Sequence, residues 1–459
     1  MKYNVIVIGA GMSGLSAAQN LAKAGFKVLI LEARNRIGGR IHTLYTDNHT
    51  PIETGAAFLK MADPTNPFNP LKTQLQHLNL KTLPMDIYNS DAYDPEGQHK
   101  SLLAQKEVAN DAYKAMTLSI QEAYRLYLEK KPSLAQILGN TDANVPRLGS
   151  PDFFAQQTLN HMVQQHTGSS LKKVSLNELI HNEGALQDEY ITGGYHRLPQ
   201  FMLDTAISTN NVKLHLNAVA TEILYAQKGE NEVQVTTRDN ESFFANAVLC
   251  TLPLGVLKKN APHFFPPLSL PKQKAIQHMG IGHQNTVIVE FEKAFWPTDV
   301  HYLFPGSKNV DEFPEYVNLY HFTSKKSPSL ACNYYGKNAL FKDISDDQII
   351  AKTLAPLQKV YGKLSPLKLA TITHWDTDNY TLGSTSYCGL QFRPEDLENL
   401  SFKEPGGLYF AGAHTTANKN RETVQGAYLS GLRAAMEIHY DLKHKAQAHS
   451  SELHPKTRL

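Results

Sequence analysis

The sequence predicts an α/β fold, and its first forty residues carry that prediction. Residues 4–8 form a largely β-branched apolar run, which is typical of a strand buried on both faces. Residues 15–24 follow with helical character and end at Gly25, a residue that suits a helix C-cap. Residues 27–31 form a second buried run. The order strand, helix, strand indicates a βαβ unit with parallel strands.

A glycine motif stands at the first turn of this unit. Residues 9–14, Gly-Ala-Gly-Met-Ser-Gly, have the spacing G-x-G-x-x-G, and Glu32 follows the second strand. Gly9 permits the tight turn, Gly11 lets a pyrophosphate approach the backbone, and Gly14 permits close packing of helix and strand. The helix N-terminus offers N–H groups to phosphates, and Glu32 can accept ribose hydroxyls. We therefore predict a Rossmann-like dinucleotide site, although this motif alone does not separate NAD from FAD.

Composition excludes several other classes of protein. Lys and Arg number 45 against 43 Asp and Glu, and a net charge of +2 argues against a nucleic-acid binder. The three cysteines, Cys250, Cys332 and Cys388, are too few and too far apart for a disulfide framework or a zinc motif. We expect reduced thiols and no metal site.

Hydropathy gives no sign of a membrane segment. No stretch approaches the 18 or so uncharged apolar residues of a spanning helix, and the N-terminus lacks the pattern of a secretory signal. Residues 441–459 are polar and are expected to form a frayed tail. We predict a soluble, cytoplasmic protein.

The residues after the second strand carry a resemblance to a known family. Residues 31–40 read L-E-A-R-N-R-I-G-G-R, which resembles the flavin-containing amine oxidases: monoamine oxidases, polyamine oxidases and the catalytic domain of lysine-specific histone demethylases. Further similar segments lie at residues 52–58, 191–198, 216–223, 248–257, 265–267, 407–415 and 423–433. The resemblance implies FAD. Its attachment is expected to be noncovalent, because Ser384 stands where monoamine oxidases carry the linking cysteine.

The resemblance implies that FAD contacts come from distant parts of the chain. The strand over residues 216–223 is similar to one that contacts the adenine. The expected cofactor-binding residues are Gly9, Gly11, Met12, Ser13, Gly14, Glu32, Ala33, Arg34, Gly39, Arg40, Gly55, Ala56, Ala57, Phe58, Val219, Ala220, Thr251, Trp375, Gly412, Ala413, Thr423 and Val424.

Two interleaved domains are expected. The FAD-binding domain is assigned to residues 1–75, 188–280 and 372–440, and an α+β substrate domain to residues 76–187 and 281–371. Apolar residues at helical spacing over 106–129 predict a helix in the first insertion. Alternation at Val287, Val289 and Phe291 predicts a strand with one buried face in the second.

The chemistry implied by the resemblance is amine oxidation. A hydride from the carbon beside a neutral amine passes to flavin N5, the imine hydrolyses, and O2 is reduced to hydrogen peroxide. Three residues are expected to be catalytic. Trp375 would lie beside the flavin, Thr286 aligns with a lysine that the family bonds to N5 through water, and Lys60 stands where polyamine oxidases carry a histidine. Lys60 in the pocket would disfavour a polycation; a surface lysine is the alternative.

Departures from the family pattern keep other functions open. Thr286 supplies no positive charge, the family's A-G-E-x-T reads Ala-Gly-Ala-His-Thr with Ala413 in place of glutamate, and Thr385 and Thr423 replace paired aromatics. A backbone shift could bring Glu422 to the cofactor, although a solvated loop carboxylate is the simpler interpretation. The alternatives are a flavin-dependent C–C dehydrogenase or desaturase, and a flavin-binding scaffold without turnover. Acidic residues suited to a polyamine are Asp86, Asp91 and Asp94, which are also typical turn residues.

Overall fold

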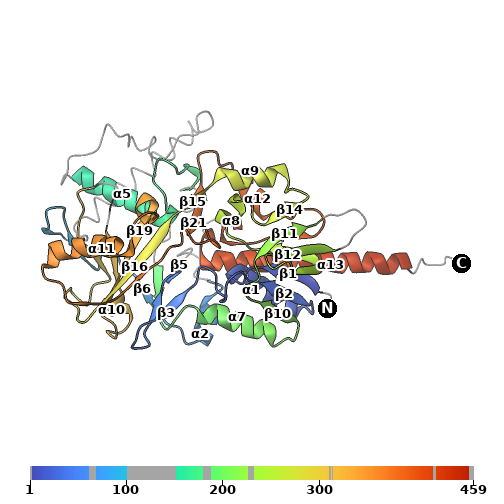
Figure 1. The fold of residues 1–459 in the computed structure, drawn as a ribbon, viewed down its shortest axis with the longest axis horizontal. Helices are drawn as coiled ribbons and strands as arrows, with labels where there is room; N and C mark the ends of the chain where they lie inside the picture. The colour runs from blue at the N-terminus through green and yellow to red at the C-terminus, as the bar shows by residue number, and fades with distance from the viewer. Residues whose placement is uncertain are drawn as a thin grey trace. The chain divides into compact units, whose positions relative to one another are not determined.

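The computed structural model describes residues 3–60, 69–100, 151–178, 188–225, 232–309, 312, 314–416 and 420–453. The helix expected over residues 106–129 lies outside these ranges. The chain divides into two compact units (Figure 1). The first unit comprises Met1–Arg40, His196–Ile276 and Pro394–Leu459, and the second comprises Ile41–Tyr195 and Gln277–Arg393. The domain boundaries expected from the sequence stay a prediction.

The first unit is built on one mixed sheet, which confirms the predicted α/β class. Its strand order is β10-β2-β1-β13-β12-β11-β14, with β22 also paired to β13. The parallel part consists of β10 (Val212–His215), β2 (Val28–Leu31), β1 (Tyr3–Ile8), β13 (Ser242–Cys250) and β22 (Leu408–Phe410). The extension consists of β12 (Val233–Thr237), β11 (Ala220–Leu224) and β14 (His263–Phe265). β11 begins at Ala220, so the strand expected from residue 216 is shorter than predicted.

Helix α1 (Met12–Lys23) follows the glycine turn and packs between α7 (Arg197–Ile207) and α13 (Val424–Leu453), the long red helix of Figure 1. The two helices α1 and α13 approach closely at Gly431, where a Cβ would lie only 2.1 Å from the carbonyl oxygen of Ser13. Gly25, with φ of +88°, follows α1 as predicted. Because α13 continues to Leu453, the expectation of a frayed tail from residue 441 is wrong for residues 441–453.

Shorter helices complete the first unit: α8 (Leu254–Lys258), α9 (Leu270–His278), α12 (Glu395–Ser401) and the 3-10 turn η3 (Ala413–Thr415). Within the described part of the chain, no helix combines the length and the apolar character needed to cross a membrane.

The second unit is built on a seven-stranded sheet with the order β20-β16-β19-β18-β17-β7-β8. These strands are β20 (Leu367–Ile372), β16 (Gln284–Phe291), β19 (Ser329–Tyr335), β18 (Glu315–Asn318), β17 (Tyr302–Phe304), β7 (Ser90–Tyr93) and β8 (His99–Lys100). All neighbours are antiparallel except β17 and β7.

Both faces of β16 are buried, which corrects the prediction of one buried face. Val287, Val289 and Phe291 pack in a core that α11 (Asp346–Tyr361) covers with Ile349 and Leu357. Ile288, on the other face, belongs to a second cluster. The strand is therefore central, and alternation could not reveal this because the second face is covered by residues distant in sequence.

Smaller elements surround this sheet. They are the pair β3 (Thr43–Tyr45) and β4 (Pro51–Glu53); the sheet β5 (Phe58–Lys60), β9 (Asp188–Ile191) and β6 (Thr82–Pro84); the pair β15 (Met279–Gly282) and β21 (Thr385–Cys388); and α2 (Lys72–His77), α5 (Pro151–Thr167), α10 (Leu319–Phe322) and η2 (Gly336–Ala339).

Candidate active site

The glycine turn between β1 and α1 has the geometry that the motif predicts. Gly9 has φ of +104°, and a Cβ there would lie 2.6 Å from Thr251 Oγ1. A Cβ on Gly14 would lie 2.0 Å from the Gly9 carbonyl oxygen. A Cβ on Gly11, in contrast, would meet no atom within 4 Å. Gly9 and Gly14 are therefore required by packing, whereas Gly11 borders open space at the helix N-terminus.

Glu32 is fixed at the end of β2 by backbone groups. Its side chain accepts hydrogen bonds from the N–H of Ala10 at 2.7 Å and of Arg34 at 2.9 Å, and the residue is buried. The backbone of residues 217–218 joins the same edge, since Ala218 N–H donates to the Glu32 carbonyl. Val219 and Ala220 follow Ala218 directly in the chain. A carboxylate has about four acceptor sites, so two remain for ligand hydroxyls.

The second glycine loop lies directly against the first. Gly38 N–H donates to the Ala10 carbonyl at 2.9 Å, and a Cβ on Gly39 would lie 3.4 Å from the Gly11 Cα. Arg36 is turned back onto the carbonyl of Gly39 at 3.0 Å. The first unit therefore brings the G-x-G-x-x-G turn, Glu32 and the G-G-R loop together, as the sequence predicts.

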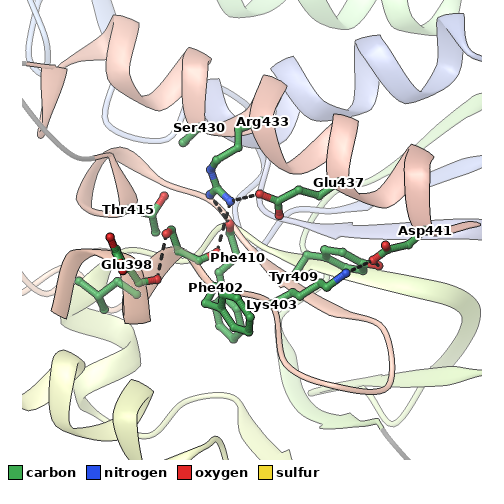
Figure 2. A network of polar contacts seen from close by, with 12 residues as sticks. Glu398, Phe402, Lys403, Tyr409, Phe410, Thr415, Ser430, Arg433, Glu437 and Asp441 are labelled. Carbon is green, nitrogen blue, oxygen red and sulfur yellow. Dashed lines mark hydrogen bonds and ion pairs between the residues drawn. The ribbon is translucent and has the colours of Figure 1, made fainter. Parts of the chain in front are cut away.

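The start of α13 is capped and braced. Thr423 Oγ1 accepts the N–H of Gly426 at 3.0 Å, as an N-cap residue does, and Val424 is the first helical residue. Figure 2 shows how the helix holds β22: Arg433 donates to the Phe410 carbonyl at 2.7 Å and pairs with Glu437, while Tyr409 and Lys403 bind Asp441. These contacts fix the segment that carries Gly412.

In the second unit, Trp375 is held at both ends. Its indole N–H donates to the Thr54 carbonyl at 3.0 Å, directly before Gly55, and its backbone N–H donates to Asn285 Oδ1 at 2.8 Å. Asn285 is fully buried and also accepts from Thr373 Oγ1 at 3.0 Å. Asn285 thus positions the tryptophan, although sequence reasoning missed it. Its strand, β16, begins with three polar residues in succession, Gln284, Asn285 and Thr286, and nothing in the sequence separates Asn285 from its neighbours.

Thr286 lies next to Asn285 on β16. Its backbone N–H donates to Thr373 Oγ1 at 2.8 Å, and its hydroxyl donates to Asn333 Oδ1 at 2.9 Å. The side chain is therefore part of a hydrogen-bond network inside the second unit.

Residues 55–60 lie along β9. The Ile191 N–H donates to the Ala57 carbonyl, and the Phe58 ring meets the Tyr190 ring edge-on at 5.9 Å. Lys60 Nζ lies 3.9 Å from an oxygen of Asp188, its partner in the strand register. The positive charge of Lys60 is thus offset by a neighbouring carboxylate.

The match to one protein family decides which family this chain belongs to. Residues 12–439 match the family described as flavin containing amine oxidoreductase. The chain belongs to this family. It is an FAD-dependent amine oxidoreductase, as the resemblance predicted.

Curated relatives of this amine oxidase lie in plants. Polyamine oxidase 5 of Oryza sativa subsp. japonica is 30% identical over 94% of this chain and 87% of its own length. Probable polyamine oxidase 4 of Arabidopsis thaliana is 28% identical over 94% of this chain and 86% of its own length. Lysine-specific histone demethylase 1 homolog 3 of Arabidopsis thaliana is 28% identical over 95% of this chain and 30% of its own length.

Glu422 lies close to Ala413, the position where the family pattern has a glutamate. Glu422 donates its N–H to the Ala413 carbonyl at 3.1 Å, and its carboxylate pairs with Arg40 at 2.9 Å. Glu422 adopts φ of +55°, an uncommon conformation for this residue type. The interpretation of Glu422 as a solvated loop carboxylate is therefore wrong, because its side chain is 9% exposed and faces the G-G-R loop.

His414, beside Ala413, is a buried neutral imidazole. Burial lowers its pKa to about 4, the charge of Glu422 opposes this, and Arg40 and Lys272 lower the pKa further. A Cβ on Gly412 would lie 2.7 Å from the His414 ring, and Gly412 has φ of +144°. Only glycine fits beside this ring, which explains Gly412 by packing.

Two of the three acidic residues suited to a polyamine, Asp86 and Asp94, serve local turns. Asp94 accepts the N–H groups of Glu96 and Gln98, and Asp86 accepts the N–H of Tyr88. Asp91 accepts the Tyr361 hydroxyl. The contacts of Asp86 and Asp94 agree with the simpler interpretation as turn residues, whereas Asp91 lies in β7 and bonds to Tyr361 at the end of α11.

Glu53 is a titratable residue that sequence reasoning did not select. It accepts the Thr43 hydroxyl at 2.6 Å and the Tyr195 N–H at 2.8 Å. Burial raises the pKa of Glu53 to about 7, although both hydrogen bonds act to lower it. Glu53 directly precedes Thr54 and the glycine segment at residue 55, so its protonation state bears on the stability of that segment.

Proposed function

We propose that this enzyme oxidises an amine C–N bond to an imine by hydride transfer to flavin N5, with O2 as acceptor and H2O2 as product. The amine carbon loses a hydride while the nitrogen lone pair forms the C=N bond, and water then hydrolyses the imine. Two electrons and two protons reach O2. FAD supplies the hydride acceptor, and the protein supplies binding, orientation and exclusion of water.

The observation that carries the proposal is the open space beside Gly11, bordered by the G-G-R loop and Glu32. No other glycine of the motif has this freedom: Gly9 and Gly14 are filled by packing. A pyrophosphate at the N-terminus of α1 would meet N–H groups and the positive end of the helix dipole. The residues present therefore fit FAD.

The proposed attachment of FAD is noncovalent because Ser384 offers no thiol, and the residues proposed to hold FAD are given for each unit by itself. In the first unit they are Gly9, Gly11, Met12, Ser13, Gly14, Glu32, Ala33, Arg34, Gly39, Arg40, Val219, Ala220, Thr251, Gly412, Ala413, Thr423 and Val424. In the second they are Gly55, Ala56, Ala57, Phe58 and Trp375.

Lys60 bears on the choice of amine. An unpartnered lysine would repel a polycation, but the Asp188 carboxylate at 3.9 Å offsets that charge. The pair removes the reason to exclude polyamines, and polyamine oxidases are among the relatives. We propose an amine substrate that includes di- and polyamines.

Thr286 favours a second candidate function, a flavin-dependent C–C desaturase. The hydroxyl of Thr286 donates to Asn333 and brings no positive charge where the family carries a lysine. A desaturase would not need that charge. A scaffold without turnover is less favoured, because Glu422, bonded through its N–H to Ala413, directs a carboxylate to Arg40 of the G-G-R loop.

Mixing the yellow holoenzyme anaerobically with monoamines, diamines, polyamines and amino acids tests the proposal. We expect one amine class to bleach the flavin band, and readmitted air to restore it with release of hydrogen peroxide. A flavin band that no amine bleaches would reject amine oxidation. Bleaching without recovery in air would reject O2 as the acceptor.

The cytoplasm is the proposed location. Cys250, Cys332 and Cys388 are all buried thiols, which suits a reducing compartment. We propose no nucleic-acid partner, because positive and negative charges nearly balance.

Glu422→Ala is expected to weaken FAD binding about tenfold, or about 1.4 kcal/mol. The variant removes the carboxylate that pairs at 2.9 Å with Arg40, one of the residues proposed to hold FAD. Titration of apoprotein with FAD, followed by quenching of flavin fluorescence, measures the effect. Asp299→Ala is the control, since Asp299 also pairs with a basic residue, Lys325, at 3.0 Å, away from the residues proposed to hold FAD. Equal FAD affinity in Glu422→Ala and in the control would contradict the assignment.

A further inference from the structure

A row of polar side chains crosses three adjacent strands of the second unit. Thr286 on β16 is the register partner of Asn333 on β19, which is in turn the partner of Glu315 on β18. Thr286 Oγ1 donates to Asn333 Oδ1 at 2.9 Å, and Asn333 Nδ2 donates to Glu315 Oε1 at 2.7 Å. The three side chains therefore form one continuous chain of hydrogen bonds on one face of the sheet.

The next row on the same face is apolar. It consists of Ile288, Ala331 and Val317, which are register partners in the same three strands and belong to one buried cluster. The polar row is thus set beside a dry core, where an unsatisfied polar group costs about 1–3 kcal/mol.

The far end of the row is an ionised carboxylate. Glu315 is 1% exposed, and it accepts from His161 of α5 at 2.8 Å and from the Tyr335 hydroxyl at 2.9 Å. Burial alone raises the pKa of Glu315, but bonds and charge from His161, together with bonds from Asn333 and Tyr335, hold it below its ordinary value.

The carboxylate fixes the direction of every hydrogen bond in the row. An ionised carboxylate only accepts, so the Asn333 amide must turn its NH2 to Glu315 and its oxygen to Thr286. The Thr286 hydroxyl must then donate to that oxygen, and its own oxygen is left as an acceptor. This polarity is opposite to that of a lysine, which only donates.

We propose that Glu315 and Asn333 are positioning residues that fix Thr286 as a hydrogen-bond acceptor for the N–H of a primary or secondary amine substrate. The inference rests on the proposed function and deepens it. Thr286 contacts the substrate nitrogen and directs its lone pair, whereas Glu315, held by His161, acts only through Asn333. A tertiary amine, which has no N–H in its neutral form, cannot make this contact.

The test compares N-methylbutylamine with N,N-dimethylbutylamine. For each amine, the dissociation constant is read from the perturbation of the oxidised flavin spectrum, and the anaerobic rate of flavin reduction is read by stopped flow. In the wild type we expect the secondary amine to be preferred about tenfold, the size of one hydrogen bond of ordinary strength. Thr286→Val should bring this ratio close to one, and Thr286→Ser should keep it.

Glu315→Gln tests the positioning role. A glutamine can donate to Asn333, which frees the asparagine amide to reverse and lets Thr286 lose its fixed polarity, so the preference should fall as in Thr286→Val. The variant that combines Thr286→Val with Glu315→Gln should lose no more of the preference for the secondary amine than either single variant, because both residues act through the same row of hydrogen bonds. Glu290→Gln is the control, since Glu290 is a buried carboxylate on β16 that pairs with Lys368 outside the row.

The outcomes separate this inference from the proposed function. If the wild type binds N-methylbutylamine with the tenfold preference but this amine does not reduce the flavin, the result rejects amine oxidation and leaves the inference about Thr286 in place. An unchanged preference in Thr286→Val, or a wild type that binds both amines equally, overturns the inference. If Glu315→Gln does not fold, Thr286→Val and Thr286→Ser still decide, because they leave the buried Glu315–His161 pair in place.

Discussion

A Gly11→Val variant is expected to fold as the wild type does and to be purified without flavin. Gly11 has φ of −78° and ψ of 180°, a conformation that valine readily adopts. Its Cβ position has no atom within 4 Å, so the protein itself offers no obstacle. The obstacle is the cofactor, because a side chain at this point would occupy the space proposed for the pyrophosphate.

Gly14→Ala provides the contrast. Its Cβ would lie 2.0 Å from the oxygen and 3.1 Å from the carbon of the Gly9 carbonyl, and backbone cannot move aside cheaply. We expect Gly14→Ala to lose soluble, folded protein, whereas Gly11→Val keeps the wild-type circular dichroism spectrum. The ratio of flavin to protein absorbance measures the cofactor. A yellow Gly11→Val protein would reject the pyrophosphate assignment.

The first forty residues could be predicted because their information is local. Buried strands read as β-branched runs, and the glycine spacing encodes the turn that joins them to α1. Glu32 follows from its distance to Gly9, and the start of α13 at Val424 follows from Thr423, which caps the helix. In each case, the residues that predict a structural element lie within that element or directly beside it in the sequence.

The remaining site residues depend on register and on loop geometry. Asn285 holds Trp375, and Asn333 joins Glu315 to Thr286, yet these contacts link residues 18 to 90 positions apart. The periodicity of a single strand does not predict a row of polar side chains that crosses several strands. Glu422 reaches Arg40 only because its backbone adopts a positive φ, which a sequence does not display. The family resemblance identified the substituted positions and pointed to Glu422, but it could not decide between a solvated loop carboxylate and one directed at the G-G-R loop.

Glu53→Gln is expected to make the stability of the holoenzyme less dependent on pH. The folded pKa of Glu53 is about 7, above the ordinary value of 4.5, so between these values the folded state binds the proton more tightly than the unfolded state does. The contribution of protonated Glu53 is therefore complete below pH 4.5 and is lost as the pH rises through 7. A shift of this size corresponds to about 3 kcal/mol as an upper bound.

A glutamine at residue 53 keeps the shape and can still accept the Tyr195 N–H and bond to the Thr43 hydroxyl, but it carries no charge at any pH. Urea unfolding of wild type and variant from pH 5 to pH 8.5 measures the difference between their free energies of unfolding. We expect this difference to shift in favour of the variant as the pH rises from 5 to 7, and to level off above pH 7, where Glu53 is ionised in both the folded and the unfolded state. Glu437→Gln, an exchange on the partly exposed surface of α13, should follow the wild type. A constant difference across the range would show that Glu53 is ionised throughout, and that its two hydrogen bonds outweigh the cost of burial.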